Sequence, residues 1–248
     1  MDLAPGIIVL VFAAFFVAGS VKGLIGVGLP TVSIAILINA MPLREAIPLI
    51  IAPAVISNVV QALSGGHMLE LAKRFWLLCT LTVLFTWVGV SILASSDQRL
   101  MSAIFGIVLT IYALTGLLRP APRPLGASER WLTPAVGVVN GLINGLTGSY
   151  MLPSVIYLQS LGLTKDELIQ AMGIFFLVAG TALGVSLAGQ KVMSLGQTAI
   201  SAAALLPALI GYYFGLRLRN RLSEERFRQI FFIGLLLLGI YTIARTTI

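Results

Sequence analysis

The sequence predicts an all-helical polytopic membrane protein of two inverted repeats, each a broken re-entrant helix followed by three transmembrane helices. Three observations predict this class. The 248 residues are 58% hydrophobic and only 10% charged, whereas an ordinary soluble domain is about 25% charged. Apolar runs of about 20 residues recur along the chain, each long enough to cross the roughly 30 Å hydrocarbon core of a bilayer. A glycine-rich interruption occurs once in each half.

Helices are favoured over strands because a bilayer cannot satisfy the backbone groups at the edge of an open sheet. The apolar runs also lack the in-out alternation of an outer-membrane barrel. The net charge of +7 comes mostly from short basic clusters between apolar runs, where membrane topology explains it. Nucleic acid is therefore not an expected partner, whereas the lipid bilayer is.

Polar breaks divide the chain into eight apolar segments. They lie near residues 5–40, 46–64, 75–94, 100–118, 131–161, 168–188, 195–216 and 227–244. Six have the length of one crossing. The first and the fifth are about 30 to 35 residues long, too long for one straight helix, and glycine and polar residues interrupt each in its middle. We expect these two to be broken helices.

The two interruptions resemble each other. One reads GSVKGLIGVGLP over residues 19–30, the other GLINGLTGSYMLP over residues 141–153, and three glycines match at an offset of 122 residues. Such self-similarity indicates an internal duplication. The halves are residues 1–118 and 131–248, joined by a Pro- and Arg-containing linker at 119–130.

The distribution of Lys and Arg predicts the topology. If each broken segment crosses once, the basic residues divide seven against eight and predict no orientation. If each enters and returns as a hairpin of two half-helices, eleven lie on one side and only Arg44, Arg99, Lys191 and Arg245 on the other. This bias favours re-entrant hairpins, a cytoplasmic linker and both termini outside. Three crossings per half make the repeats inverted.

The broken segments are the predicted substrate site. Half-helix N-termini present free N–H groups and about +0.5 charge each, so two of them favour an anion. Pro30 and Pro153 are placed like first residues of second half-helices, where a missing N–H has no consequence. Lys22 is the one charged residue well inside an apolar segment, at an insertion cost of roughly 2.5 to 3.5 kcal/mol.

The candidate substrate-binding residues are polar or glycine residues of the breaks, with one from the second segment. They are Ser20, Lys22, Gly26, Gly28, Thr31, Asn58, Asn140, Asn144, Thr147, Gly148, Ser149 and Ser154. Each has a structural alternative. Glycines such as Gly19, Gly23, Gly137, Gly141 and Gly145 also have helix-packing spacing. Lys22 could snorkel to an interface, and the two break asparagines could only satisfy neighbouring backbone.

Two further polar groups have alternatives of the same kind. Asn58 and Gln61 share one face of the second segment, where they could line the same cavity as the predicted substrate site or join helices. His67, in a Ser-Gly-Gly-His loop, is expected at the surface, and the single cysteine, Cys79, is expected to serve packing.

Several chemistries have no motif in this sequence. It contains no Walker A pattern, no HExxH, no GxSxG and no Asp or Glu deep in a span. One cysteine provides neither a disulfide nor a metal cluster. We therefore expect no enzyme activity, no metal and no cofactor.

With two four-segment halves, each opening on a break such as GSVKGLIGVGLP, the chain resembles the sulfite exporter TauE/SafE family of bacterial inner-membrane permeases. The resemblance implies transport of small anions such as sulfite, sulfoacetate, other organosulfonates or thiosulfate. It also suggests a homodimer. The family's first motif is usually richer in consecutive glycines, and the second copy here has Ser149-Tyr150 instead, so the substrate stays open.

The functional prediction is a secondary transporter, an exporter by resemblance, that moves a small sulfur-containing or carboxylic anion by alternating access. Lys22 would neutralise the anion, and backbone N–H groups of both breaks would cradle it. Asn140, Asn144 and Ser149 would supply side-chain donors. The alternatives are an anion channel and a non-transporting membrane scaffold subunit.

Overall fold

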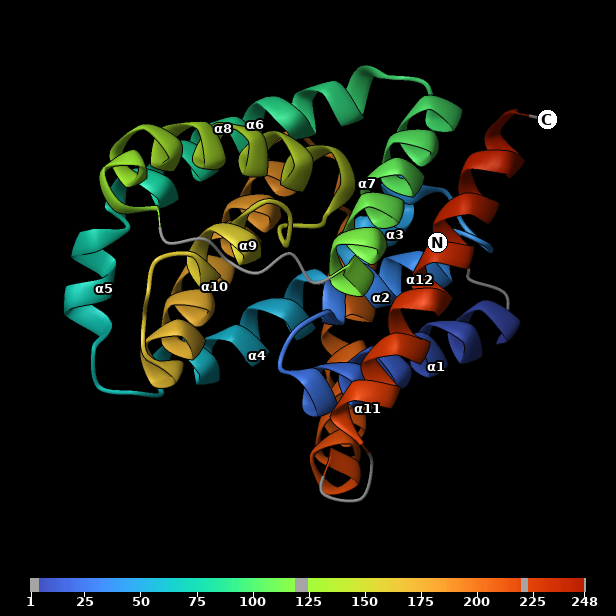
Figure 1. Cartoon of the computed structure of the whole chain (residues 1–248). Coiled ribbons are helices and arrows are strands. Elements are labelled where there is room, and N and C mark those ends of the chain that lie inside the picture. Colours follow the sequence, from blue (N-terminus) through green and yellow to red (C-terminus); the bar gives the residue numbers. More distant parts are fainter. Residues whose placement is uncertain (1–4, 119–124, 220–222, 248) are drawn as a thin grey trace. The chain divides into compact units, whose positions relative to one another are not determined.

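The computed structural model describes residues 5–118, 125–219 and 223–247. Over these ranges the chain forms helices joined by short turns and contains no strand, as predicted (Figure 1). Most of the predicted linker, residues 119–124, and both chain ends lie outside the described residues.

The first half of the chain begins with a long helix, a short helix and a bent pair. Its helices are α1 (Pro5–Ile25), α2 (Leu29–Leu37), α3 (Leu43–Leu49), α4 (Ile51–Leu63), α5 (Met68–Arg74), α6 (Trp76–Ser95) and α7 (Gln98–Leu118). The 41° bend between α3 and α4 has a covalent cause. Pro53 has no N–H to donate to Leu49, and its ring would clash with that carbonyl. The N–H of Ala52 donates instead to Ser201 Oγ at 3.0 Å.

The second half repeats this order of elements. After the 3-10 turn η1 (Gly126–Ser128), its helices are α8 (Glu129–Thr147), α9 (Ser154–Gln159), α10 (Lys165–Gly189), α11 (Leu195–Arg219) and α12 (Glu224–Thr247). Each half thus has a long helix, a break, a short helix and then three longer segments, the bent pair of the first half matching α10. The short helix α5 has no counterpart in the second half.

Within the described ranges, six helical stretches are long and apolar enough to cross a bilayer. They are Gly6–Ile25, Trp76–Ser95, Gln98–Leu118, Lys165–Gly189, Leu195–Arg219 and Glu225–Thr246. The bent pair α3 and α4 would make a seventh if it is one span. Five of the six predicted ordinary spans therefore appear as single long helices, and the segment predicted at 46–64 is the bent pair.

The described chain divides into two compact units that do not coincide with the two halves. Unit 1 contains α1, α2, α3, α7, α11 and α12, and unit 2 contains most of α4 together with α5, α6, η1, α8, α9 and α10. Each unit therefore combines the broken helix of one half with helices of the other half.

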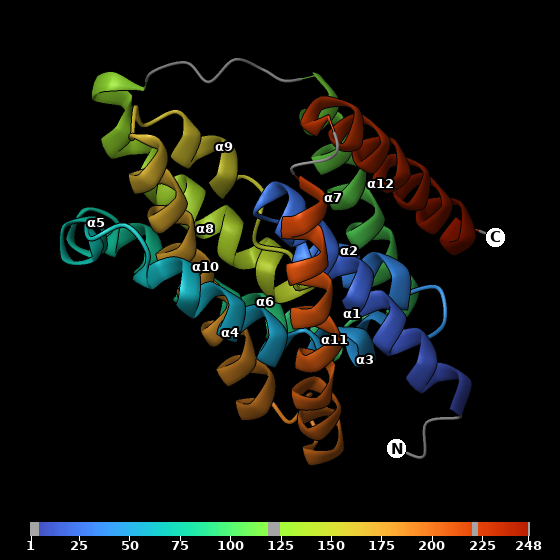
Figure 2. The ribbon, with the colours of Figure 1, turned by 90° about the horizontal axis from the view of Figure 1, so that it is seen from below.

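In unit 1, α1 packs against α11 (Figure 2). Glycines on both helices lie in this contact. A side chain at Gly19 would overlap the backbone of Ala208, and one at Gly215 would overlap the carbonyl of Ser20. Helix α7 packs along α12, where the rings of Tyr112 and Phe232 meet edge to face at 5.3 Å. Small residues let the helix backbones approach closely. The van der Waals packing that results is a main source of helix association inside lipid.

Unit 2 has the equivalent contact between α8 and α6. Side chains at Gly141 and Gly145 would overlap the backbone of Thr82 and Thr86, and one at Gly89 would lie 2.7 Å from the carbonyl of Leu142. The close contacts at Gly19, Gly141 and Gly145 confirm the helix-packing interpretation of these three glycines. The long helix before each break thus packs on a helix from the other half of the chain.

Candidate functional site

The break in unit 1 is made by two glycines. Gly26 and Gly28 have φ values of +83° and +105°, in the left-handed region that other residues rarely adopt. The N–H of Gly26 donates to the carbonyl of Lys22 at 2.8 Å and so closes the last turn of α1. The carbonyl of Gly28 accepts from the N–H of Val32 at 2.9 Å, which begins α2. Helix α2 then packs against α1.

Lys22 lies in the last turn of α1, three residues before the helix ends. Its side chain is only 6% exposed. Free carbonyls at a helix C-terminus favour a nearby cation, which offsets part of the cost of burying the ammonium group. Within the same short stretch, α2 begins with Leu29, Pro30 and Thr31, and the N–H groups of a first helical turn have no partner inside the helix. The break between α1 and α2 therefore contains both the buried ammonium group of Lys22 and the buried N-terminus of α2.

Two other candidates of this break differ in position. Thr31 is buried in the first turn of α2. Ser20 is half-buried on α1, and its hydroxyl donates back to the carbonyl of Phe16 at 2.8 Å. Such a bond to the preceding turn is the usual one for a serine inside a helix, so it points to a local role for Ser20.

The break in unit 2 is longer and ends in a shorter helix. Gly148 ends α8 with φ +71°, and its N–H donates to the carbonyl of Asn144 at 2.8 Å. Helix α9 begins at Ser154 and has only six residues. The Ser154 hydroxyl donates to the carbonyl of Tyr150 at 2.6 Å. The hydroxyl of Thr147 accepts from the N–H of Ser149 at 3.2 Å. This second arm is therefore shorter than the half-helix expected there.

Asn140 and Asn144 have fully buried side chains whose N–H groups are already used. The Nδ2 of Asn140 donates to the carbonyls of Tyr150 and Leu152 at 2.9 and 3.0 Å. The Nδ2 of Asn144 donates to Thr86 Oγ1 at 3.0 Å and to the carbonyl of Ala179 at 2.9 Å. The two amides thus hold the break and neighbouring helices in place.

The Oδ1 atoms of the same two asparagines are buried and accept no hydrogen bond from the described part of the chain. Because each Nδ2 points at two acceptors, the orientation of each amide is fixed. What Asn140 and Asn144 leave available is therefore an acceptor. An anion needs donors, so in this geometry neither amide offers the group that the sequence prediction assigned to it.

Asn58 reaches the same break from α4. Its Nδ2 donates to the hydroxyl of Tyr150 at 3.1 Å, and the buried Tyr150 ring lies 5.0 Å from the ring of Phe176. Tyr150 was outside the predicted set, although its place in the middle of the second break is a signal that the sequence carries. Gln61 joins helices, because its Nε2 donates to the carbonyl of Ile169 at 3.1 Å. His67 is exposed, as predicted.

The twelve predicted site residues fall into two groups. Unit 1 contains Ser20, Lys22, Gly26, Gly28 and Thr31, and unit 2 contains Asn58, Asn140, Asn144, Thr147, Gly148, Ser149 and Ser154. Among the described residues, no group of three or more His, Cys, Asp or Glu side chains could hold a metal ion.

The family model described as sulfite exporter TauE/SafE matches residues 11–242, nearly the whole chain. The chain belongs to the TauE/SafE family. Neither a curated protein nor a solved structure matches it. Membership of this family, together with the candidate spans, identifies the chain as a multi-pass membrane protein of a family of anion exporters. The glycine breaks described above lie inside the matched range.

In this TauE/SafE protein, Asn140→Ala is expected to lower stability because the buried carbonyl of Leu152 loses the hydrogen bond from Asn140 Nδ2. Leaving one buried carbonyl unsatisfied costs about 1–2 kcal/mol. The measurement is the thermal midpoint of the detergent-purified protein. Asn39→Ala is the matched control, because the Asn39 amide is only half-buried and donates to carbonyls of its own helix end. Equal midpoints for both variants would contradict the role given to Asn140.

Proposed function

We propose that the chain is a secondary transporter that exports small sulfur-containing or carboxylic anions, such as sulfite or organosulfonates, by alternating access. Membership of the TauE/SafE family supports the anion class. The observation that carries the proposal is the buried Lys22 in a helix break formed by two glycines of positive φ. A charge retained inside an apolar segment is a functional feature by default.

The binding chemistry follows from the break in unit 1. The Lys22 ammonium neutralises the anion, and the backbone N–H groups of residues 27–29 donate to its oxygens. The N–H of Gly26 is already used in the bond to Lys22. Charge-assisted hydrogen bonds of this kind are about twice as strong as neutral ones. Gly28 is required by its positive φ, whereas nothing lies within 4 Å of a Cβ placed on Gly26, so the backbone is open at Gly26. We therefore assign primary substrate binding to the break between α1 and α2.

The break in unit 2 has a different role in this proposal. Asn58 and Asn140 position the segment from Gly148 to Pro153 through the bonds described above. Asn144 ties α8 to α6 and α10. Helix α9 has six residues, so its dipole is weaker than that of a longer helix. We assign these residues to holding the shape of the break.

We further propose the re-entrant topology, with the linker in the cytoplasm and both termini in the periplasm. It is tested by single cysteines in a Cys79→Ser background. Glu70→Cys and Ser194→Cys lie on opposite sides of the membrane if both breaks re-enter, and on the same side if each broken segment crosses once. A membrane-impermeant maleimide should label position 194 in intact cells and position 70 only after permeabilisation. Equal labelling of both positions would contradict the re-entrant topology.

The transport proposal is tested in proteoliposomes that contain this chain alone. Uptake of sulfite, sulfoacetate, thiosulfate and acetate is compared with uptake of a cation of similar size. Saturable uptake of at least one anion, with no cation uptake, is the expected result. An absence of anion uptake by folded, correctly inserted protein would favour the scaffold alternative.

A further inference from the structure

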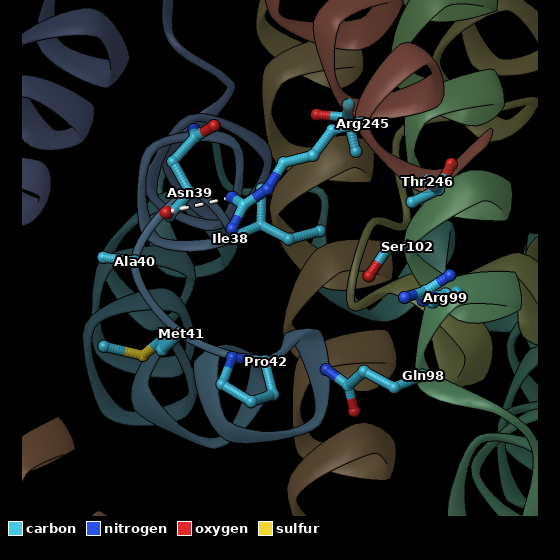
Figure 3. A pocket seen from close by; sticks show the side chains of 11 residues that line it. Ile38, Asn39, Ala40, Met41, Pro42, Gln98, Arg99, Ser102, Arg245 and Thr246 are labelled. Atoms are coloured by element: carbon cyan, nitrogen blue, oxygen red, sulfur yellow. Dashed lines mark hydrogen bonds between the residues drawn. The ribbon is translucent and has the colours of Figure 1, made fainter. Parts of the chain in front are cut away.

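A pocket of about 400 Å³ lies in unit 1, apart from the break between α1 and α2. Three segments line it: the turn from Ile38 to Pro42, the start of α7 and the end of α12 (Figure 3). No residue from 22 to 31 is part of the lining. The pocket is therefore separate from the proposed transport site within this unit.

The polar groups of this pocket are mostly cationic or hydrogen-bond donors. Arg99 and Arg245 contribute two guanidinium groups from different helices, and no Asp or Glu is among the lining residues. Figure 3 shows Arg99, Ser102 and Gln98 along the side formed by α7, with the Arg245 side chain reaching across toward Asn39. A pocket lined in this way favours a ligand with several anionic oxygens.

One donor of the pocket has no acceptor among the described residues. The Nε2 of Gln98 is shielded from solvent and makes no hydrogen bond there. Arg245 is held by one bond, from Nη1 to the carbonyl of Asn39 at 3.1 Å, and its other N–H groups are not used by that bond. An arginine carries five donors, so most of its capacity is available for a ligand.

The walls of the pocket are fixed by contacts elsewhere in unit 1. Arg44 Nη2 donates to the carbonyl of Ser96 at 2.7 Å and ties the segment before α7 to α3. Asp97 Oδ1 accepts from the N–H groups of Arg99 and Leu100 at 2.8 and 3.2 Å, so this nearby carboxylate already caps α7. Such pre-formed walls reduce the entropy lost when a ligand binds.

The pocket lies where two candidate spans end. Helix α7 begins at Gln98 and α12 ends at Thr247, and we place these ends of two candidate spans near the boundary between bilayer and water. Arginine side chains at this boundary can bind the phosphates of lipid headgroups as well as dissolved anions.

From these observations we infer that the pocket binds a phosphate-type oxyanion between Arg99 and Arg245, at the membrane surface. The oxyanion is the phosphate of an anionic phospholipid headgroup or a free small oxyanion. Arg99 and Arg245 provide charge-assisted bonds, and Gln98 supplies a neutral donor. This site is additional to the transport site and does not depend on the substrate proposed above.

The test compares both sources on the full-length protein. One arm measures retention of phosphatidylglycerol against phosphatidylcholine by native mass spectrometry, after exchange into mixed-lipid nanodiscs. The other titrates the detergent-purified protein with inorganic phosphate at constant ionic strength and measures the rise in thermal midpoint. Each arm uses the wild type, the double variant Arg99→Gln/Arg245→Gln and the control Arg226→Gln, an exposed arginine at the other end of α12.

The expected result is preferential binding in at least one arm that weakens about tenfold in the double variant and is unchanged in the control. Binding in the lipid arm alone identifies a headgroup, and binding in the phosphate arm alone identifies a free ion. The inference is overturned if neither arm shows binding, or if the double variant binds as the wild type does. Both arginines are exposed, so the variants are expected to fold.

Discussion

Lys22→Met is expected to reduce anion uptake in proteoliposomes by about 10- to 100-fold while the folded yield changes little. The lost contribution is that of charge-assisted hydrogen bonds to an anion, about 1.5–3 kcal/mol. Methionine keeps the apolar stem that packs at the end of α1, so the fold loses a charge without gaining a cavity. Uptake is measured as initial rate per folded, inserted protein.

Two variants make this result specific to Lys22. Lys165→Met removes an exposed lysine at the start of α10 and should leave uptake unchanged. Lys22→Arg keeps the charge with a different shape and should retain part of the activity. A parallel fall in uptake and folded yield in Lys22→Met would make Lys22 a structural residue and remove the main support for the proposed site.

Gly19→Leu is expected to have the largest effect on folding, with most of the folded protein lost. Any Cβ at Gly19 would overlap the backbone of Ala208, and backbone cannot move aside as a flexible side chain can. Separation of α1 from α11 would remove the closest helix contact of unit 1, a loss of about 3 kcal/mol or more. The measurement is the monodisperse fraction on size-exclusion chromatography after mild detergent extraction.

The matched control is Gly234→Leu on α12, where nothing lies within 4 Å of an added Cβ. That variant should elute like the wild type, since leucine also favours helix more than glycine does. If Gly19→Leu were as well folded as Gly234→Leu, the packing of α1 on α11 would be wrong.

The sequence was sufficient to predict the helical class and the places where the helices break. Gly26, Gly28 and Gly148 all have positive φ, which explains why glycine stands at these positions. The length of each arm was harder to predict. Helix α9 has six residues and begins only at Ser154, because Asn140 ties the segment before Pro153 to α8.

Long-range pairing was the part that sequence reasoning could not provide. Glycines at a four-residue spacing predict close packing, yet the spacing does not say that Gly19 meets Ala208 or that Gly141 meets Thr82. The direction of an asparagine amide depends in the same way on partners distant in sequence, such as Ala179 for Asn144. From the sequence, Arg99 and Arg245 contribute only to the Lys and Arg count that predicts topology. They lie 146 positions apart, so the sequence does not show that they line one pocket.

The most direct test of the central claim is counterflow in proteoliposomes that contain only this chain. Vesicles are loaded with an unlabelled anion that the uptake comparison identifies as a substrate. Entry of the same anion in labelled form is then followed, with loaded and empty vesicles held at the same membrane potential. A carrier with one alternating site predicts entry several times faster than into empty vesicles, with no acceleration in Lys22→Met. Entry at the same rate into loaded and empty vesicles would indicate a channel and contradict alternating access.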